Sequence, residues 1–305
     1  MDLFLHHFDA SPFAEKIRLA LGFKGLAWRS VEIPMVMPKP DLTALTGGYR
    51  GTPVLQVGAH VYCDTARIAV ELERRFPEPP LFPAGSTGLA LALAAWSDRD
   101  FFRAGAALSL GTNDALPEAV VADRRAYFAD LIDFANLSRD LDHHYAQFAA
   151  HLALVEAMLA DGRGWVLGGD PSWADILAYF PLWMARGNVP ALAPVIDARP
   201  AVVAWERRVA GLGHGRREPA DAALALAVAR ACEPEFEPEV SPLARPALAV
   251  GDLVAVAPVG LGSPPVRGLL QRLTDQEIAI LRDDSQLGRV MVHFPRIGYR
   301  VERAR

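Results

Sequence analysis

The chain has 305 residues, 51% of them hydrophobic and 22% charged; this globular balance argues against wholesale disorder and predicts two or more domains. Its net charge of −5 gives no basis for nucleic-acid binding, and no apolar run is long enough for a membrane helix. Cys63 and Cys232 form no CxxC pair, so the sequence supports neither a disulfide framework nor a zinc site. We therefore expect a cytoplasmic protein that binds no metal, nucleic acid or membrane.

The first 79 residues predict alternating strands and helices. Apolar residues recur at i, i+4 and i+8 after Pro12, which indicates an amphipathic helix, and Gly58 marks a hairpin. The expected elements are a strand over 3–8, a helix over 12–24, a strand over 26–33, a short helix over 41–48, strands over 52–58 and 60–63, and a helix over 64–76. Helical crossovers predict parallel pairing in the first half, and the hairpin predicts antiparallel pairing in the second.

Residues 86–232 predict a second, all-helical domain. It follows the proline-rich linker PEPPLFPAG, which cannot continue a regular element. Helical segments are expected near 87–109, 123–138, 142–161, 173–187, 199–211 and 219–231, separated by Gly, Pro or polar breaks.

Residues 246–305 predict a third, β-rich domain. Five stretches alternate apolar and polar residues, over 251–259, 266–274, 277–283, 288–296 and 298–303. Five strands in so short a segment predict a small closed barrel of the SH3-like kind. The sequence leaves two roles open for it, an accessory domain and a partner-binding module.

Ser11 raises the first question of chemistry. It stands directly before Pro12, a residue favoured at the first position of a helix, and so is placed as the N-cap. One interpretation is a plain cap whose hydroxyl accepts a backbone N–H. The other is a hydroxyl that donates to an anion at the helix N-terminus, where free N–H groups already favour negative charge.

Two further features lie in the stretch GTPVLQVGAHVYCDT. Pro53 opens a strand, and a cis bond between Thr52 and Pro53 would expose the Thr52 backbone to a peptide alongside. Asp64 and Thr65 begin a helix, which offers a second anion site beside an acidic side chain. Together with Ser11, these features suit a short anionic peptide that carries a thiol.

Three segments of residues 1–230 resemble the glutathione transferase family. SPFAEKIRLAL is similar to its serine-type catalytic motif, GTPVLQVGAHVYCDTARI to its proline strand and glutathione-binding helix, and GWVLGGDPSWADILAYFPLW to its second-domain signature. The resemblance implies a thioredoxin-like domain followed by a helical domain, commonly as a homodimer. It also implies a buried capping box between Ser172 and Asp175.

The resemblance also implies residue roles. Ser11 would hydrogen-bond the glutathione sulfur and favour its thiolate, which is the nucleophile. Lys39 would bind the glycyl carboxylate, a role for which Arg50 competes. The glutathione-binding residues would be Phe13, Lys39, Thr52, Pro53, Asp64 and Thr65.

The chain departs from the family pattern at three places. Asp64-Thr65 stands where Glu-Ser is usual, Thr52 where valine is usual, and Gly51 where a basic residue is common. The charge and hydroxyl of the helix start survive these changes, and Thr52 would act through its backbone. Serine at position 11 disfavours thiol exchange, because serine forms no mixed disulfide.

Other polar and aromatic residues have two interpretations. Phe102 and Arg103 are candidates for the electrophile pocket, although aromatic residues at helical spacing are more often core. Adjacent His6 and His7 point to opposite faces of a strand, which argues against a shared metal and favours packing. Cys63 is expected to be a buried small hydrophobe.

The resulting hypothesis is a glutathione-dependent transferase that conjugates the thiolate to a small, apolar electrophile, as in detoxification. Isomerisation and reductive dehalogenation would use the same thiolate. The alternative is a non-catalytic dimerisation scaffold whose C-terminal barrel binds a partner, motivated by the Asp64-Thr65 departure and by the added barrel.

Overall fold

The computed structural model describes residues 2–242 and 245–304. The chain forms two compact units, which we describe separately. The sheet unit comprises Met1–Ala14, Ala27–Glu71 and Arg216–Arg305, and the helical unit comprises Glu15–Leu26 and Leu72–Gly215. This division is coarser than the three segments expected at 1–79, 86–232 and 246–305, which we retain as a proposal about sequence domains.

The N-terminal elements follow the predicted order. They are β1 (Phe4–His7), α1 (Pro12–Phe23), β2 (Ala27–Glu32), α2 (Pro40–Thr46), β3 (Val54–Val57), β4 (His60–Cys63) and α3 (Thr65–Arg75). Strand β1 pairs in parallel with β2 and antiparallel with β3, and β3 pairs antiparallel with β4 across a turn at Gly58, whose φ is +60°. The expected thioredoxin-like arrangement of parallel and antiparallel strands is confirmed.

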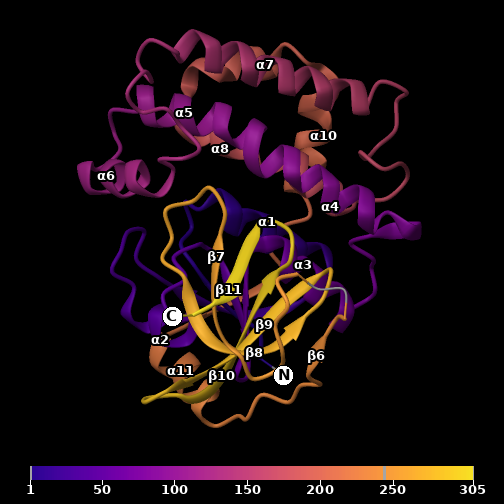
Figure 1. Ribbon diagram of the computed structural model, residues 1–305. Coiled ribbons are helices and arrows are strands. Elements are labelled where there is room, and N and C mark those ends of the chain that lie inside the picture. Colours follow the sequence, from indigo (N-terminus) through magenta and orange to yellow (C-terminus); the bar gives the residue numbers. More distant parts are fainter. Residues whose placement is uncertain (1, 243–244, 305) are drawn as a thin grey trace. The chain divides into compact units, whose positions relative to one another are not determined.

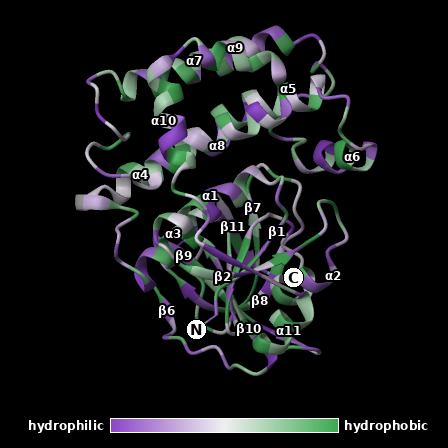
Figure 2. Cartoon of the chain, turned by 180° about the vertical axis from the view of Figure 1, so that it is seen from behind, coloured by the Kyte–Doolittle hydropathy of each residue, from purple (hydrophilic) through white to green (hydrophobic). Residues whose placement is uncertain are grey.

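The helical unit holds the predicted second domain, with altered boundaries. Its elements are η1 (Pro83–Gly85), α4 (Thr87–Ala95), the π-helical segment η2 (Trp96–Phe101), α5 (Phe102–Thr112), α6 (Glu118–Tyr127), α7 (Leu141–Met158), α8 (Trp173–Asn188), η3 (Pro190–Leu192), α9 (Ala193–Asp197) and α10 (Pro200–Ala210). The helix expected over 123–138 is wrong in extent, because α6 ends at Tyr127 and the following residues form turns. Figure 1 labels α4 to α8 and α10, and Figure 2 labels α9.

The last part of the expected helical domain belongs to the sheet unit instead. Strand β5 (Arg216–Ala220) pairs in parallel with β2, so the expectation of an all-helical domain over 86–232 is wrong here. Helix α11 (Ala222–Arg230) packs against α2, β2 and β10, and Gln56 donates to the carbonyl of Ala225 at 2.8 Å. Its sequence is almost wholly apolar, and Figure 2 colours it largely green, although only Ala225 and Ala229 are buried and Leu224 is exposed.

Five C-terminal strands lie where the sequence predicts them, after a short strand that it does not predict. In chain order, the strands are β6 (Glu239–Val240), β7 (Leu253–Pro258), β8 (Val266–Leu273), β9 (Glu277–Asp284), β10 (Gly288–Pro295) and β11 (Tyr299–Arg303), orange to yellow in Figure 1. Neighbours pair antiparallel in the order β11-β7-β8-β9-β10. Strand β10 then pairs in parallel with β4, with Val292 opposite Val61, so these strands extend the N-terminal sheet. A β-rich C-terminal region is confirmed, and its SH3-like topology stays a prediction.

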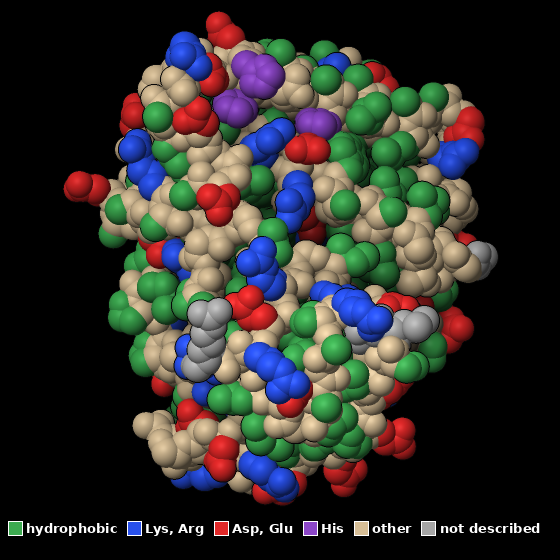
Figure 3. All heavy atoms as spheres, in the orientation of Figure 1, with side chains coloured by type: hydrophobic (Ala, Val, Ile, Leu, Met, Phe, Trp, Pro, Cys, Tyr) green, Lys and Arg blue, Asp and Glu red, His purple; other side chains and the backbone are tan. Residues whose placement is uncertain are grey.

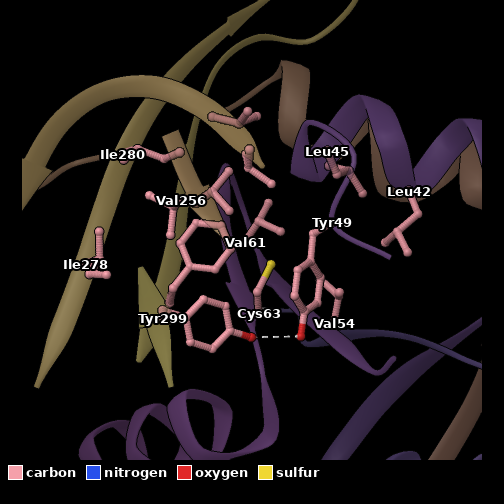
Figure 4. Packing of buried hydrophobic residues seen from close by; sticks show 14 of the residues in the cluster. Leu42, Leu45, Tyr49, Val54, Val61, Cys63, Val256, Ile278, Ile280 and Tyr299 are labelled. Atoms are coloured by element: carbon pink, nitrogen blue, oxygen red, sulfur yellow. Dashed lines mark hydrogen bonds between the residues drawn. The ribbon is translucent and has the colours of Figure 1, made fainter. Parts of the chain in front are cut away.

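One hydrophobic core joins the N-terminal and C-terminal parts of the sheet unit. Leu42, Leu45, Val54 and Cys63 pack in the same cluster as residues from β7 to β11 (Figure 4). The cluster includes Val254, Val256, Val266, Leu270, Leu273, Ile278, Ile280, Val290, Val292, Phe294, Tyr299 and Val301. Each buried aliphatic or aromatic side chain contributes roughly 1.5–3 kcal/mol relative to exposure. The C-terminal strands are therefore structurally inseparable from the thioredoxin-like part.

None of the helices in the described parts of the chain has the length and apolarity needed to cross a membrane.

Candidate functional site

Ser11 is an N-cap with a proton to spare. Ser11 is 3% exposed, and its Oγ accepts a hydrogen bond from the N–H of Ala14, at 3.1 Å, in the first turn of α1. Within residues 2–242 and 245–304, no acceptor takes the Ser11 hydroxyl proton. Because a hydroxyl has one donor and two acceptor positions, the capping bond leaves Ser11 able to donate. Phe13, on the same turn, is partly buried.

The second group gathers before β3. Lys39 is 4% exposed, its Nζ donates to Thr52 Oγ1 at 3.0 Å, and it lies 5.6 Å from the centre of the Phe8 ring. The bond between Thr52 and Pro53 is cis, the geometry on which the expected backbone recognition depends. Lys39 and Thr52 are thus brought together, although the sequence separates them by a proline-rich loop.

The third group is the start of α3. Asp64 has φ of +74°, a left-handed conformation that few residues other than glycine adopt and that asparagine and aspartate tolerate best. Its Oδ1 accepts from the N–H of Ala66 at 2.9 Å. Thr65 is 3% exposed and is the first residue of the helix. An uncommon backbone conformation at a predicted ligand-binding residue is typical of functional sites.

The C-terminal strands reach these same segments. Arg50 donates to the carbonyl of Gly262 at 3.0 Å, and Arg282 of β9 donates to the carbonyl of Ala44 at 2.9 Å near the end of α2. Tyr299 of β11 donates through its hydroxyl to Asp64 Oδ2 at 3.1 Å. Arg50 and Lys39 each donate a hydrogen bond within the chain, so the choice between them as partner of a ligand carboxylate stays a prediction.

Gly51 has a steric reason for lacking a side chain. A Cβ at this position would lie 2.3 Å from the Tyr49 hydroxyl oxygen, far inside van der Waals contact. Tyr49 in turn lies 3.1 Å, hydroxyl to hydroxyl, from Tyr299 (Figure 4). A side chain at position 51 would therefore collide with Tyr49 in its present position.

His6 and His7 are both buried and each hydrogen-bonds a different partner. His6 Nε2 lies 2.9 Å from Gln56 Oε1, and His7 Nε2 lies 2.9 Å from Ser30 Oγ. Burial lowers the pKa of His6 to about 4, against the opposing effects of Gln56 and Asp41. The expected packing role of the two histidines agrees with these contacts.

Cys63 is fully buried in the core cluster, and burial raises the pKa of its thiol well above the usual value. The thiolate, which is the reactive form, is therefore suppressed. The expectation of a buried small hydrophobe is confirmed.

The two candidates for the electrophile pocket differ in environment. Phe102 is 3% exposed and packs against Phe128 and Phe180 at ring-centre distances of 5.6 and 6.1 Å, as a core residue does. Arg103 pairs with Asp100 at 3.0 Å and lines a hollow of about 480 Å³ in the helical unit. Histidine, acidic and basic side chains gather on this face in Figure 3. The assignment of both residues to an electrophile pocket stays a prediction.

The predicted capping box at α8 is confirmed. Asp175 is fully buried and accepts from the N–H and the hydroxyl of Ser172, at 3.0 and 2.9 Å. It also accepts from the N–H of Val166 at 2.7 Å and from Trp205 Nε1 at 2.9 Å. This carboxylate therefore ties together three segments of the helical unit.

Comparisons with known proteins agree with this architecture. The family model described as "Glutathione S-transferase, N-terminal domain" matches residues 5–80, and the C-terminal domain model of the same family matches residues 118–208. The crystal structure of a GST-like protein from Pseudomonas syringae is 39% identical, covers 99% of both chains and has a TM-score of 0.81. The chain belongs to the glutathione S-transferase superfamily.

Two other relatives of this superfamily member differ in what their names say. A glutathione S-transferase from Rhodospirillum rubrum F11 is 26% identical, covers 68% of this chain and 87% of the other, and has a TM-score of 0.52. FtsZ-localized protein A from Caulobacter vibrioides (strain NA1000 / CB15N) is 29% identical over 180 residues, which cover 57% of this chain and 73% of that protein. One relative is named as a transferase, the other by where it localises.

Sequence reasoning missed Tyr49 and Tyr299. Tyr299 follows a turn in the segment RIGYRVER and carries no motif, and its contact with Asp64 joins residues 235 positions apart. The absence of a side chain at Gly51 was visible in the sequence, but its cause was not.

Proposed function

We propose that this superfamily member binds glutathione at the start of α1, the cis-Pro53 segment and the start of α3, and that Ser11 activates the thiol. The observation that carries the proposal concerns the Ser11 hydroxyl. It caps α1 by accepting a hydrogen bond from the N–H of Ala14, and no acceptor among the described residues takes its own proton. A donor at a helix N-terminus favours an anion such as a thiolate.

Ser11 would act by stabilising the ionised form of the bound thiol. A free cysteine thiol has a pKa of about 8.5, so only a small share is thiolate at neutral pH. A hydrogen bond to the charged sulfur lowers this pKa and raises the reactive share. The thiol proton leaves to solvent, the sulfur forms a bond to an electrophilic carbon, and the leaving group departs with its electron pair.

The remaining residues would hold the peptide. The Thr52 backbone would pair with the cysteinyl group, Thr65 and the first N–H groups of α3 would bind the γ-glutamyl carboxylate, and Asp64 would bind the ammonium. Lys39 Nζ, already 3.0 Å from Thr52, would bind the glycyl carboxylate. A cytoplasmic location, a homodimeric assembly and an apolar electrophile remain predictions.

The second candidate is a non-catalytic scaffold whose C-terminal strands bind a partner. It is supported by the similarity to FtsZ-localized protein A. The hydrogen bond that Arg50 donates to the carbonyl of Gly262 also supports it, because this bond brings the loop after β7 next to a predicted site residue.

Glutathione binding by calorimetry, with ultraviolet absorbance of the bound thiolate as a function of pH, tests the proposal. We expect the wild type to bind and to lower the thiol pKa, and Ser11→Ala to bind while losing that shift. Ser172→Ala is the matched control, because it removes another serine cap and should leave the thiol pKa unchanged. Absence of glutathione binding by a folded wild type would reject the proposal and favour the scaffold.

A further inference from the structure

We propose that Tyr299 is a positioning residue of the glutathione site. Its hydroxyl orients the Asp64 carboxylate toward the ammonium group of a γ-glutamyl ligand. The inference rests on the proposed function. It assigns part of the glutathione site to the C-terminal strands, outside both segments that match the family models.

Both oxygens of Asp64 are held. Oδ1 accepts from the N–H of Ala66 at 2.9 Å, and Oδ2 accepts from the Tyr299 hydroxyl at 3.1 Å. Each carboxylate oxygen has two lone pairs and can therefore accept more than one hydrogen bond. Because a separate donor holds each oxygen, the carboxylate has a defined orientation when an ammonium group binds to it.

The direction of the hydrogen bonds follows from the acceptor. An ionised carboxylate can only accept, so the Tyr299 proton points to Asp64 and Tyr49 donates to Tyr299 across 3.1 Å. Both tyrosines are 6% exposed, and hydrogen bonds in such surroundings strengthen one another. The chain from Tyr49 through Tyr299 to Asp64 thus stabilises the carboxylate as an anion.

The tyrosines are themselves fixed by packing. Tyr299 begins β11, pairs with Pro258 of β7, and lies 5.5 Å from Phe294 between ring centres. Tyr49 lies 6.0 Å from the same ring and fits only because Gly51 has no Cβ. A group held on a paired strand positions a ligand-binding side chain better than one on a free loop.

The test compares glutathione with glutaryl-cysteinylglycine, the same peptide without the α-amino group, on the full chain by calorimetry. For the wild type we expect glutathione to bind about ten- to a hundredfold more tightly, as for a hydrogen bond to a charged group. Tyr299→Phe keeps the packed ring and removes the hydroxyl. We expect it to weaken glutathione binding about three- to tenfold and to leave the affinity for the analogue unchanged.

Tyr49→Phe is the second variant and should reduce the same discrimination by a smaller factor. Tyr62→Phe is the matched control, because Tyr62 is a buried tyrosine of the sheet unit that stacks on His293, and it should leave the discrimination unchanged. Equal losses for both peptides, no change, or tighter glutathione binding in Tyr299→Phe would overturn the inference alone. A wild type that binds neither peptide would reject the proposed function, and the role of Tyr299 with it.

Discussion

Ser11 and Ser172 occupy the same position relative to a helix and do different things. The Ser11 hydroxyl accepts a hydrogen bond from the N–H of Ala14 and donates none to any of the described residues. The Ser172 hydroxyl, in contrast, donates to Asp175. Ser172 is therefore committed to holding the helical unit together, and Ser11 has a bond left for a ligand. A serine at a helix start indicates function only when the proton of its hydroxyl is uncommitted.

The largest expected effect is a loss of stability when Asp175, the acceptor of the Ser172 hydroxyl, is removed. Asp175→Ala removes the acceptor of four hydrogen bonds from buried donors, and each unsatisfied donor costs roughly 1–3 kcal/mol. We expect the free energy of unfolding to fall by about 4 kcal/mol or more, a large share of the usual 5–15 kcal/mol. Urea unfolding followed by circular dichroism measures it. A loss below about 1 kcal/mol would contradict the structural role given to this carboxylate.

A second test concerns the strand that leads to Ser11. Since burial lowers the pKa of His6 to about 4 from an unfolded value near 6.5, the unfolded chain takes up a proton first as the pH falls. His6 therefore contributes stability that is present above pH 6.5 and is lost between about 6.5 and 4, by about 3 kcal/mol in all.

The measurement is the free energy of unfolding at several pH values across that window. In His6→Gln, which has no group titrating there, we expect a shallower fall with pH than in the wild type. Parallel curves for the two proteins would show that His6 is not the source of the acid sensitivity.

The third prediction separates the two serines by stability. Ser172→Ala removes a hydroxyl donor from a buried carboxylate and should destabilise the chain by about 2 kcal/mol. It should also lower the midpoint of thermal unfolding. A variant as stable as the wild type would mean that the remaining donors to Asp175 suffice.

The smallest effect is expected at the other serine. Ser11→Ala loses a cap worth about 1 kcal/mol, because only the N–H of Ala14 is left without its acceptor. Stability and thiol ionisation should therefore rank the two variants in opposite orders. If Ser11→Ala destabilises more than Ser172→Ala, the comparison between the two caps fails.

The sequence predicts local features of this molecule well. Alternation predicts strands β7 to β11, and the family resemblance implies the capping box in the segment S-x-x-D; both signals are short-range. The strand β5 was missed, since RREPA is charged, contains proline and is strand only through pairing with β2. The helix expected over 123–138 failed because α6 ends within that segment.

For the site, the motifs predict Ser11, Thr52, Asp64 and Thr65, and these roles stay predictions. The structure places Lys39 Nζ 3.0 Å from Thr52 Oγ1. The contact between Tyr299 and Asp64 depends on how β11 packs, which no local pattern encodes. Composition likewise could not indicate that the C-terminal strands share a sheet and a core with the first 80 residues.

The pairing of β4 with β10 joins two strands that are synthesised at very different times. Residues 60–63 leave the ribosome more than two hundred positions before residues 291–293, their partners in the sheet. During that interval β4 is an open edge, the kind of surface that recruits other chains, and long-range pairing of this sort forms slowly. Strands β10 and β11, which are synthesised long after β4, cover this edge and bring the Tyr299 hydroxyl to Asp64, so a chain truncated before β10 would lack both contacts.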